Sequence, residues 1–409
     1  MTEQAPRIIV CGAGVIGASI AFHLTRAGAP CTIVERVEVA AAASGKSGGF
    51  LALSWNDRTA LEALARRSFA LHRELATETL APCNYGYRAL DTLEAGGVLR
   101  NDSDDDDDDD ADAGDQQCRR VDRRPAWLDG SGISRIRALG STANTAQVSP
   151  KLFTRALIDD ALARGSTLRL GAVESLEFDS DSDSDSSSKT SGRERRVTGV
   201  VVDGERLAAD IVVLALGPWS GTMARFFPVL RHIGGAKANS IVMQPAAPIA
   251  SAITAHAIFL DVRWNGSHLT PEIYPRPSGE VYVCGNTEDD AELPPSAADV
   301  QPNAELCRQL KAIVDHVSSP LRKCEVAVEQ ARFLPMSAHG PLMGQLPDAA
   351  NAFVAAGHSC WGILNAPATG EALAALIIAS MPELQHLREP APFPHAVSVR
   401  EFDPRRVAR

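Results

Sequence analysis

The chain has none of the cysteine pairs that a zinc site or a disulfide framework needs. Its eight cysteines are scattered over 409 residues, and no two of them form a C-x-x-C pair. Closely spaced pairs are typical of structural zinc sites, and dense cysteine spacings are typical of small secreted domains. The cysteine pattern therefore argues against both classes, and we predict no metal site.

The chain also has no stripe of basic residues. It has 40 Lys and Arg against 51 Asp and Glu, which gives a formal net charge of -11. Much of the acidic excess lies in two tracts, Asp104–Asp110 and Asp179–Ser188, and the remainder is close to neutral. Because nucleic-acid binding needs clustered Lys and Arg, we exclude nucleic acid as a partner.

No segment resembles a targeting or membrane signal. Residues Met1–Arg7 are polar, no run of about 18 apolar residues marks a membrane helix, and Val407–Arg409 is not a peroxisomal address. We therefore expect no membrane span and, by default, a cytoplasmic location, with an organelle left open. The oligomeric state is left open.

The first 36 residues have the pattern of strand, glycine-rich turn, helix and strand. Apolar runs at Ile8–Cys11 and Cys31–Val34 suit buried parallel strands, and Ala18–Ala27 has apolar residues at helical spacing. Gly28 directly follows this helix as a C-terminal cap would. This order predicts one βαβ unit.

The turn of this unit is Gly12-x-Gly14-x-x-Gly17. Gly12 permits the tight turn, Gly14 allows close approach of a pyrophosphate, and Gly17 lets the helix pack closely on the strand. The pyrophosphate then lies at a helix N-terminus, whose N–H groups favour negative charge. Glu35, after the second strand, would accept hydrogen bonds from a ribose hydroxyl. Together these residues predict a dinucleotide site.

A second glycine-rich segment, Ser44–Gly49, follows the second strand. Nicotinamide enzymes have no standing need for it. In a flavin enzyme the ring and the pyrophosphate both need close backbone approach and N–H donors. The alternative is a flexible loop. The segment favours FAD over NAD.

The rest of the chain alternates helix and strand patterns. Helices are expected at Arg58–Thr79, from Ser149–Pro150 onward and at Ala368–Ala379. The strands expected outside residues 225–330 are Leu168–Phe178 and Arg196–Val202 as a hairpin, Ile211–Leu216 and Ala352–Ala356. Residues 225–330 contain short strand patterns separated by Pro and Gly, which indicates a mostly antiparallel inserted domain.

Two further segments make a family resemblance specific. Val213–Ser220 and above all Ala355–Gly370 resemble the FAD-contacting segments of the D-amino-acid-oxidase-like family, which includes glycine oxidase and sarcosine oxidase. The Gly-Lys-Ser-Gly-Gly segment and the acidic insertions make the chain more similar to a eukaryotic branch of that family than to glycine oxidase itself.

The resemblance implies an α/β fold with two domains. A Rossmann-like FAD-binding domain of the GR2 type would comprise residues 1–95, 140–224 and 331–385. A mixed or antiparallel-sheet substrate domain would comprise residues 225–330. The acidic stretches 101–117 and 179–192 would be disordered insertions, because they cannot bury enough apolar surface to become ordered.

The cofactor implied is FAD. The expected FAD-binding residues come from the glycine turn, the strand ends and the C-terminal segment, and they are Gly12, Gly14, Val15, Ile16, Gly17, Glu35, Arg36, Ser44, Gly45, Lys46, Ser47, Gly48, Gly49, Val173, Ala215, Gly217, Trp219, Gly357, His358, Gly362, Ile363 and Leu364. Covalent members of the family attach flavin through a cysteine at a position that corresponds to about Arg332. We therefore expect non-covalent FAD, and we interpret Cys360 as an ordinary buried cysteine.

The substrate residues depart from the family. Its amino-acid oxidases hold a substrate carboxylate with an arginine directly before a proline, but here Leu334 precedes Pro335. Arg332 lies two residues earlier, on the same face of a strand, and either replaces that arginine or is a surface residue. Tyr274 and Arg276 are a second candidate pair, the alternative being a solvated arginine beside a packed tyrosine.

The expected reaction is oxidation of a C–N bond in a small amine or amino acid, by hydride transfer to flavin N5. Two other functions stay open. The chain would be a flavin dehydrogenase if electrons pass to an acceptor other than oxygen. It would be an FAD-binding scaffold or trafficking protein with little catalysis if the missing arginine means that no substrate is held.

Overall fold

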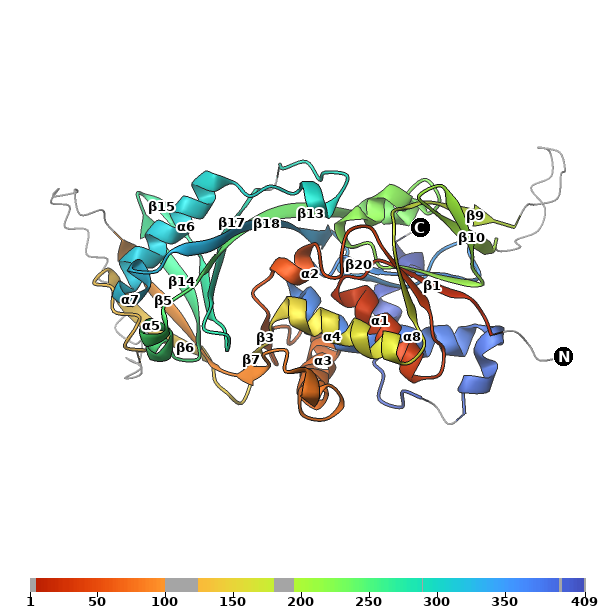
Figure 1. Ribbon diagram of the computed structural model, residues 1–409, viewed down its shortest axis with the longest axis horizontal. Coiled ribbons are helices and arrows are strands. Elements are labelled where there is room, and N and C mark those ends of the chain that lie inside the picture. The colour runs from red at the N-terminus through yellow and green to blue at the C-terminus, as the bar shows by residue number, and fades with distance from the viewer. Residues whose placement is uncertain (1–4, 100–123, 180–194, 289, 390–391, 408–409) are drawn as a thin grey trace.

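The computed structural model describes residues 5–99, 124–179, 195–288, 290–389 and 392–407. Two large sheets with their covering helices lie next to each other along the long axis of the molecule (Figure 1). The predicted acidic insertions 101–117 and 179–192 lie outside the described residues, apart from Asp179.

The first sheet has six strands in the order β19-β20-β12-β1-β2-β8. The pairs from β20 to β8 are parallel, and β19 pairs with β20 in antiparallel orientation. Its strands are β1 (Ile8–Cys11), β2 (Thr32–Glu35), β8 (Thr167–Leu170), β12 (Ile211–Leu214), β19 (Leu342–Gln345) and β20 (Ala352–Ala356). This is the doubly wound arrangement that the N-terminal pattern predicts, and the Rossmann-like fold is confirmed.

Alternate residues of the parallel strands point into two separate cores. On β1, Ile8 and Val10 face one cluster, whereas Ile9 and Cys11 face the other. The first cluster is covered by α1 (Val15–Arg26), α3 (Glu62–Glu74), α4 (Pro150–Ala163) and α8 (Gly362–Ser380). The second is covered by a small sheet of β9 (Val173–Phe178), β10 (Val197–Val202) and β11 (Glu205–Ala208). Because both faces are covered, the strands read as continuous apolar runs.

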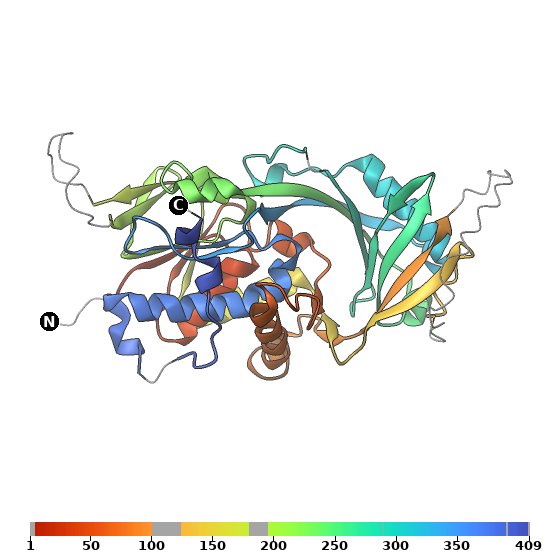
Figure 2. The same ribbon diagram turned by 180° about the vertical axis from the view of Figure 1, so that it is seen from behind.

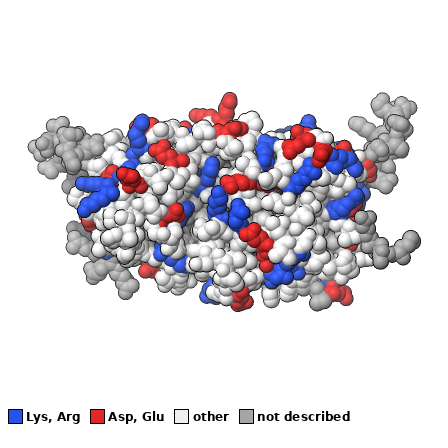
Figure 3. All heavy atoms as spheres, in the orientation of Figure 1, with Lys and Arg blue, Asp and Glu red and all other residues white. Residues whose placement is uncertain are grey.

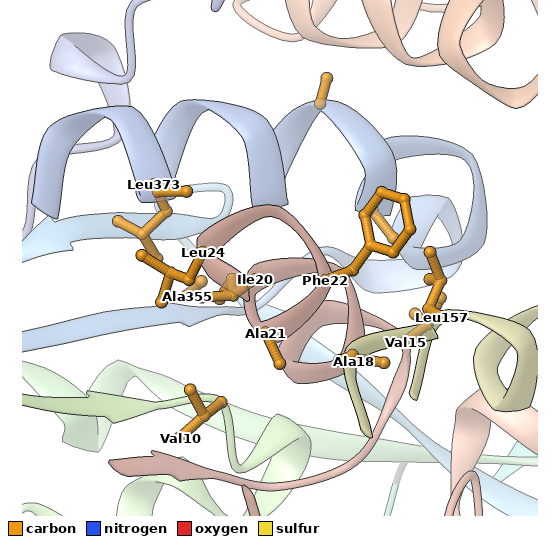
Figure 4. Close-up of a cluster of buried hydrophobic side chains, with 14 of the residues drawn as sticks. Val10, Val15, Ala18, Ile20, Ala21, Phe22, Leu24, Leu157, Ala355 and Leu373 are labelled. Atoms are coloured by element: carbon orange, nitrogen blue, oxygen red, sulfur yellow. The ribbon is translucent and has the colours of Figure 1, made fainter. Parts of the chain in front are cut away.

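Helix α1 is at the centre of the first core. Figure 4 shows Ala18, Ile20, Phe22 and Leu24 of this helix packed against strand and helix side chains from other parts of the chain, including Leu373 of α8. The helix is buried on nearly all sides, since α4 and α8 cover what the sheet does not. Its position fixes the turn that precedes it.

The second large sheet has eight strands, seven of them in the order β18-β13-β17-β16-β14-β5-β6, with β15 paired to β14. They are β5 (Asp91–Leu99), β6 (Ile133–Gly140), β13 (Ile233–Met243), β14 (His256–Trp264), β15 (Ser267–Leu269), β16 (Glu272–Pro275), β17 (Val281–Glu288) and β18 (Val326–Ser337). It is mixed, because β5 and β14 pair in parallel and the other pairs are antiparallel. This agrees with the mixed substrate sheet that was predicted.

The outer face of the large sheet packs on α6 (Ala304–Val317), as Figures 1 and 2 show. Its inner face has a separate cluster that contains Tyr274, Tyr282 and Cys284. The long strands β13 and β18 extend from this sheet toward the parallel sheet (Figure 2). The smaller elements are α2 (Ala43–Lys46), α5 (Ala247–Ala252), α7 (Ser319–Arg322), and a third sheet of β3 (Phe50–Ala52), β4 (Arg88–Ala89) and β7 (Thr145–Gln147).

Two predictions from local pattern need correction. The strand predicted at Leu168–Phe178 is two strands, because the chain turns at Gly171 (φ +155°): β8 joins the parallel sheet and only β9 forms the hairpin with β10. The large sheet also takes β5, β6 and most of β18 from outside residues 225–330. The pairing of β5 with β14 joins segments far apart in the chain, so no local pattern reveals it. The division into domains itself stays a prediction.

The segment Ser359–Ser380 is long and apolar enough to cross a membrane, by length and composition. It is the only such segment in the described part of the chain, and 78% of its apolar window is buried. The alanine-rich helix α8, which makes up most of this segment, is a core helix packed on α1 and α3. On the face shown in Figure 3, acidic and basic side chains are interspersed.

Candidate dinucleotide and substrate site

A cavity of about 1200 Å³ lies at the carboxyl ends of the parallel strands. Its walls include residues directly after or at the ends of β1, β2, β12 and β20, namely Gly12, Glu35, Ala215 and Ala356. Open α/β sheets bind ligands at this edge, where the strand order reverses. The cavity is therefore the candidate cofactor site.

The glycine turn has the close contacts that its spacing predicts. Gly12 has φ +107°, and a Cβ there would collide with the carbonyl oxygen of Ala215. A Cβ on Gly17 would collide with the carbonyl oxygen of Gly12. Larger residues would push the first turn of α1 away from the sheet.

The N-terminus of α1 opens toward the cavity. Gly14, Val15 and Ile16 line it, and the first turn has no acidic residue. The first N–H groups of a helix have no partner within it, and the helix dipole favours an anion there. The N–H of Val15 donates to Oγ of Ser44 at 2.8 Å, which ties the second glycine-rich segment to the turn.

Glu35 ends β2 on the cavity wall. Its Oε2 accepts from the N–H of Ala13 at 2.8 Å and its Oε1 from the N–H of Val37 at 3.1 Å. A carboxylate has about four acceptor sites, so both oxygens retain capacity for a ribose hydroxyl. The carboxylate thus holds the turn as well as lining the cavity.

A distant loop closes one side of the cavity. Residues Pro295–Ala297, between β17 and α6, line it. Nε1–H of Trp219 donates to the carbonyl of Pro294 at 2.7 Å, and the Arg36 guanidinium donates to the carbonyl of Pro295. Sequence reasoning misses this loop, because no local motif marks a segment that is fixed by contacts more than 70 residues away along the chain.

The C-terminal segment forms the wall next to α8. His358, Cys360, Gly362 and Ile363 line the cavity, and the first turn of α8 has no acidic residue. Burial lowers the pKa of His358 to about 4, so its imidazole is neutral at pH 7. Cys360 is exposed toward the cavity, so its interpretation as a buried cysteine is wrong. The reason is that it lies in a short 3-10 turn before α8, outside the packed helix.

Most of the predicted FAD-binding residues line this cavity. They are Gly12, Gly14, Val15, Ile16, Glu35, Arg36, Ser44, Ser47, Val173, Ala215, Gly217, Trp219, His358, Gly362 and Ile363. The other predicted residues are not among those that line it, and they are Gly17, Gly45, Lys46, Gly48, Gly49, Gly357 and Leu364. Residues that the sequence did not single out also line it, among them Ala41–Ala43, Thr222 and Pro295–Ala297. Among the described residues no group of three or more His, Cys, Asp or Glu side chains is placed to hold a metal ion.

Arg332 lies on β18, two residues before the cavity-lining Leu334. It is 7% exposed, which excludes the surface alternative. Nη1 lies 3.5 Å from Oγ of Ser240, and the buried Nε has no hydrogen-bond partner among the described residues. Burial acts to lower the pKa of Arg332, but Tyr282, Cys284 and Glu272 outweigh it, so the guanidinium stays charged.

Tyr274 and Arg276 share the inner face of the large sheet with Arg332. Tyr274 is 3% exposed and donates to Oε2 of Glu272 at 2.6 Å. Arg276 pairs with Glu280 at 3.3 Å and has a side chain only 12% exposed, so it is not a solvated arginine. Sequence reasoning misses Glu272, although its spacing from Tyr274 places both on one strand face.

Comparison with known proteins identifies the class. The family model "FAD dependent oxidoreductase" (DAO) matches residues 7–376. The oxidoreductase C1F5.03c of Schizosaccharomyces pombe is 30% identical over 398 residues, covering 92% of this chain and 95% of its own. The glycine oxidase of Pseudomonas putida is 24% identical, covering 95% of this chain and 98% of its own. The solved glycine oxidase from Geobacillus kaustophilus has a TM-score of 0.70 at 20% identity, and 98% of each chain is covered.

The chain belongs to the DAO family of FAD-dependent oxidoreductases. The predicted resemblance is confirmed, and the fungal relative agrees with a eukaryotic branch. The cofactor of this family is FAD, and the cavity fits it: the glycine turn leaves no room for a side chain, and two helix N-termini free of acidic residues face the space. The turn at Gly12 and the wall at Gly362 would hold it.

Proposed function

We propose that this oxidoreductase oxidises a C–N bond of a small amino acid or amine. The observation that carries the proposal is the buried Arg332, whose Nε has no partner among the described residues and whose neighbour Leu334 lines the cavity. A buried cation without a close anion is costly, and a guanidinium matches a carboxylate in shape and charge. A substrate carboxylate would complete this site.

Relatives support the chemistry. Solved structures of similar fold are named glycine oxidase, iminodiacetate oxidase and L-proline dehydrogenase, and each of those names states an amine or amino-acid substrate for that protein. We propose Arg332 as the carboxylate-binding residue, in place of the arginine that the family has before its proline. Tyr274 and Arg276 remain secondary candidates, because their polar atoms already bond to Glu272 and Glu280.

The chain's part in such a reaction is positioning. Bound FAD supplies the acceptor for the hydride at N5, and we propose that it is held without a covalent bond. Arg332 would orient the substrate, and the walls of the cavity would limit access of water. Hydride transfer depends on orientation more than on an acid–base pair, so positioning groups suffice.

The test is product analysis on a panel of amino acids and amines. We expect at least one member to yield ammonia or a shorter amine, together with hydrogen peroxide or a reduced artificial acceptor. Turnover with the artificial acceptor and no peroxide favours the dehydrogenase alternative. No turnover in any member of a broad panel would contradict the proposal and leave the scaffold alternative, which Leu334 before Pro335 favours.

We further propose a cytoplasmic location. The burial of α8, the one membrane-length helix in the described part of the chain, argues against anchoring in a membrane through that helix. Cell fractionation tests this: recovery in the cytosolic fraction is expected, and recovery with membranes after a salt wash would contradict it.

A further inference from the structure

We propose that Glu272 is the ammonium-binding residue of the substrate site, so that the site takes a zwitterionic amino acid between Arg332 and Glu272. The inference rests on the proposed function, because it assigns the second charged group of the same substrate. It narrows the substrate class from amines in general to molecules that have both a carboxylate and a cationic nitrogen.

One carboxylate oxygen of Glu272 accepts hydrogen bonds within the protein, and the other is available to a ligand. Oε2 accepts from the hydroxyl of Tyr274 at 2.6 Å and from the thiol of Cys284 at 3.4 Å. Within the described ranges no hydrogen bond reaches Oε1, and the residue is only partly buried. The two donors fix the carboxylate and leave one oxygen for a ligand.

Glu272 and Arg332 belong to neighbouring parts of one sheet but are not paired. Cys284 lies opposite Glu272 on one side and opposite Ser240 on the other, and Nη1 of Arg332 lies 3.5 Å from Oγ of Ser240. The charge of Glu272 is among the groups that raise the pKa of Arg332, although no ion pair within 4.0 Å joins the two among the described residues. A direct pair would cancel both charges. Two separate and opposite charges instead match a zwitterion. Each end of the zwitterion would offset the desolvation cost of one of these two side chains.

Tyr274 and Glu272 are not among the residues that line the cavity, but they lie next to its wall. Ser47 lines the cavity, and a Cβ on the next residue, Gly48, would lie 2.5 Å from the ring of Tyr274. The Tyr274 hydroxyl is the group that donates to Glu272. Glu272 is therefore joined to the cavity wall through Tyr274 and Gly48.

A series of aromatic rings makes a second connection between Tyr274 and the cavity wall. Ring centroids are 5.9 Å apart for Tyr274 and Phe259, 4.9 Å for Phe259 and Trp55, and 6.3 Å for Trp55 and Trp361. Trp361 follows Cys360, which lines the cavity. Phe259, Trp55 and Trp361 are partly exposed, so ring surface remains open. Aromatic faces beside a carboxylate favour an ammonium group through cation–π attraction.

The charge environment agrees with this role. Burial raises the pKa of Glu272, while the hydrogen bonds from Tyr274 and Cys284 and the charge of Arg332 act against that rise. An ammonium group on Oε1 would stabilise the ionised carboxylate further.

The test compares two ligands that cannot lose a hydride from the α-carbon to form an imine. The probes are 2-aminoisobutyrate and isobutyrate, which differ by the ammonium group alone. Binding to the FAD-loaded protein is measured by calorimetry and by the change in flavin absorbance. We expect the wild type to bind 2-aminoisobutyrate at least tenfold more tightly than isobutyrate. We expect E272Q to bring that ratio close to one, with isobutyrate affinity changed less than twofold.

E94Q is the matched control, because Glu94 lies in the same sheet but is paired with Arg135 and Arg137. It should keep the wild-type ratio. Equal binding of both probes by the wild type, which needs no variant to fold, would overturn the inference, as would an unchanged ratio in folded E272Q. In both cases the proposed function would stand. If the wild type binds neither probe, the inference falls, while the proposed function is decided separately by turnover on the panel.

Discussion

Arg332 is the residue on which the substrate proposal depends. It is buried, it stays charged, and its Nε is without a partner among the described residues. The family motif alone would have placed the carboxylate-binding group at position 334, where a leucine stands. The structure shows that residue 332 lies on the same strand and in a protected position, which residue spacing suggests but cannot establish.

Replacing Arg332 by Met should weaken isobutyrate binding by about 30- to 150-fold, since a charge-assisted hydrogen bond contributes about 2–3 kcal/mol. R332K should recover part of the loss, because it restores the charge without the planar fork. Calorimetry on FAD-loaded protein measures both. R135M is the control, since Arg135 is half-exposed and pairs with Glu94 and Asp261. Unchanged affinity in folded R332M would refute the role.

Three buried histidines should make the fold sensitive to acid. Burial lowers the pKa of His23 to about 3 and those of His72 and His358 to about 4, against about 6.5 in the unfolded chain. The unfolded state therefore binds the protons first, and stability present above pH 6.5 is lost as the pH falls toward 4.

For one such histidine the loss at pH 5 is about 2 kcal/mol relative to pH 7. Urea unfolding between pH 7 and pH 5 should show this trend, and H72Q should make it shallower. His72 suits the test because its Nε2 donates to the carbonyl of Ile363 at 2.9 Å. Pro367 has no N–H to donate to that carbonyl, and a glutamine retains a donor. An unchanged pH slope in H72Q would contradict the account.

At the scale of elements, the parts that sequence predicts best are those fixed by local contacts. The unit β1–α1–β2 is found as predicted, because strand, glycine turn and helix lie within 28 residues of the chain. Helix α4 begins at Pro150 as its Ser-Pro start predicts. The pairing of β5 with β14 and the break at Gly171 were missed, since both depend on distant partners or on one backbone angle.

In the candidate site, too, the residues fixed by local contacts are predicted better than those fixed by distant partners. The glycine turn and the segment before α8 are local motifs, and most of their predicted residues line the cavity. The Pro294–Ala297 loop and Glu272 are in place only because β17 and β16 belong to a sheet built from distant segments. Sequence spacing therefore predicts the cofactor wall much better than the substrate wall.

The Pro294–Ala297 loop should contribute to retention of FAD. W219F removes the hydrogen bond from Nε1 to the carbonyl of Pro294 and leaves a smaller aromatic ring in place of the indole. A neutral hydrogen bond contributes about 1 kcal/mol, so FAD affinity of the apoprotein should fall about fivefold, measured by fluorescence titration. W127F is the matched control, because Trp127 donates to Thr254 away from the cavity. Equal losses in both variants would contradict a specific role for the loop.

At the scale of the whole molecule, each of the two large sheets presents a different part of the candidate site. The parallel sheet and its helices present the glycine turn and two helix N-termini, and the large sheet contributes Leu334 and Pro335 to the cavity and presents Arg332 and Glu272 beside it. The long strands β13 and β18 extend from one part toward the other. Cofactor and substrate would therefore meet where the two parts of the molecule meet.

We expect FAD to be bound non-covalently, because the family resemblance places the cysteine of covalent members at about position 332, which is an arginine here. Acid precipitation of the yellow protein should release all of the FAD into the supernatant. Because Cys360 is the thiol on the cavity wall, C360S is the informative comparison. Flavin that stays with the precipitate in the wild type but not in C360S would contradict the expectation.

The central claim is that an amino acid bound in front of FAD reduces it. The most direct measurement is the flavin absorbance of the purified protein under anaerobic conditions during addition of amino acids, with matched amines that lack the carboxylate. The account predicts bleaching of the flavin band by at least one amino acid, and much slower bleaching by the matched amine. A flavin band that no amino acid bleaches would contradict it.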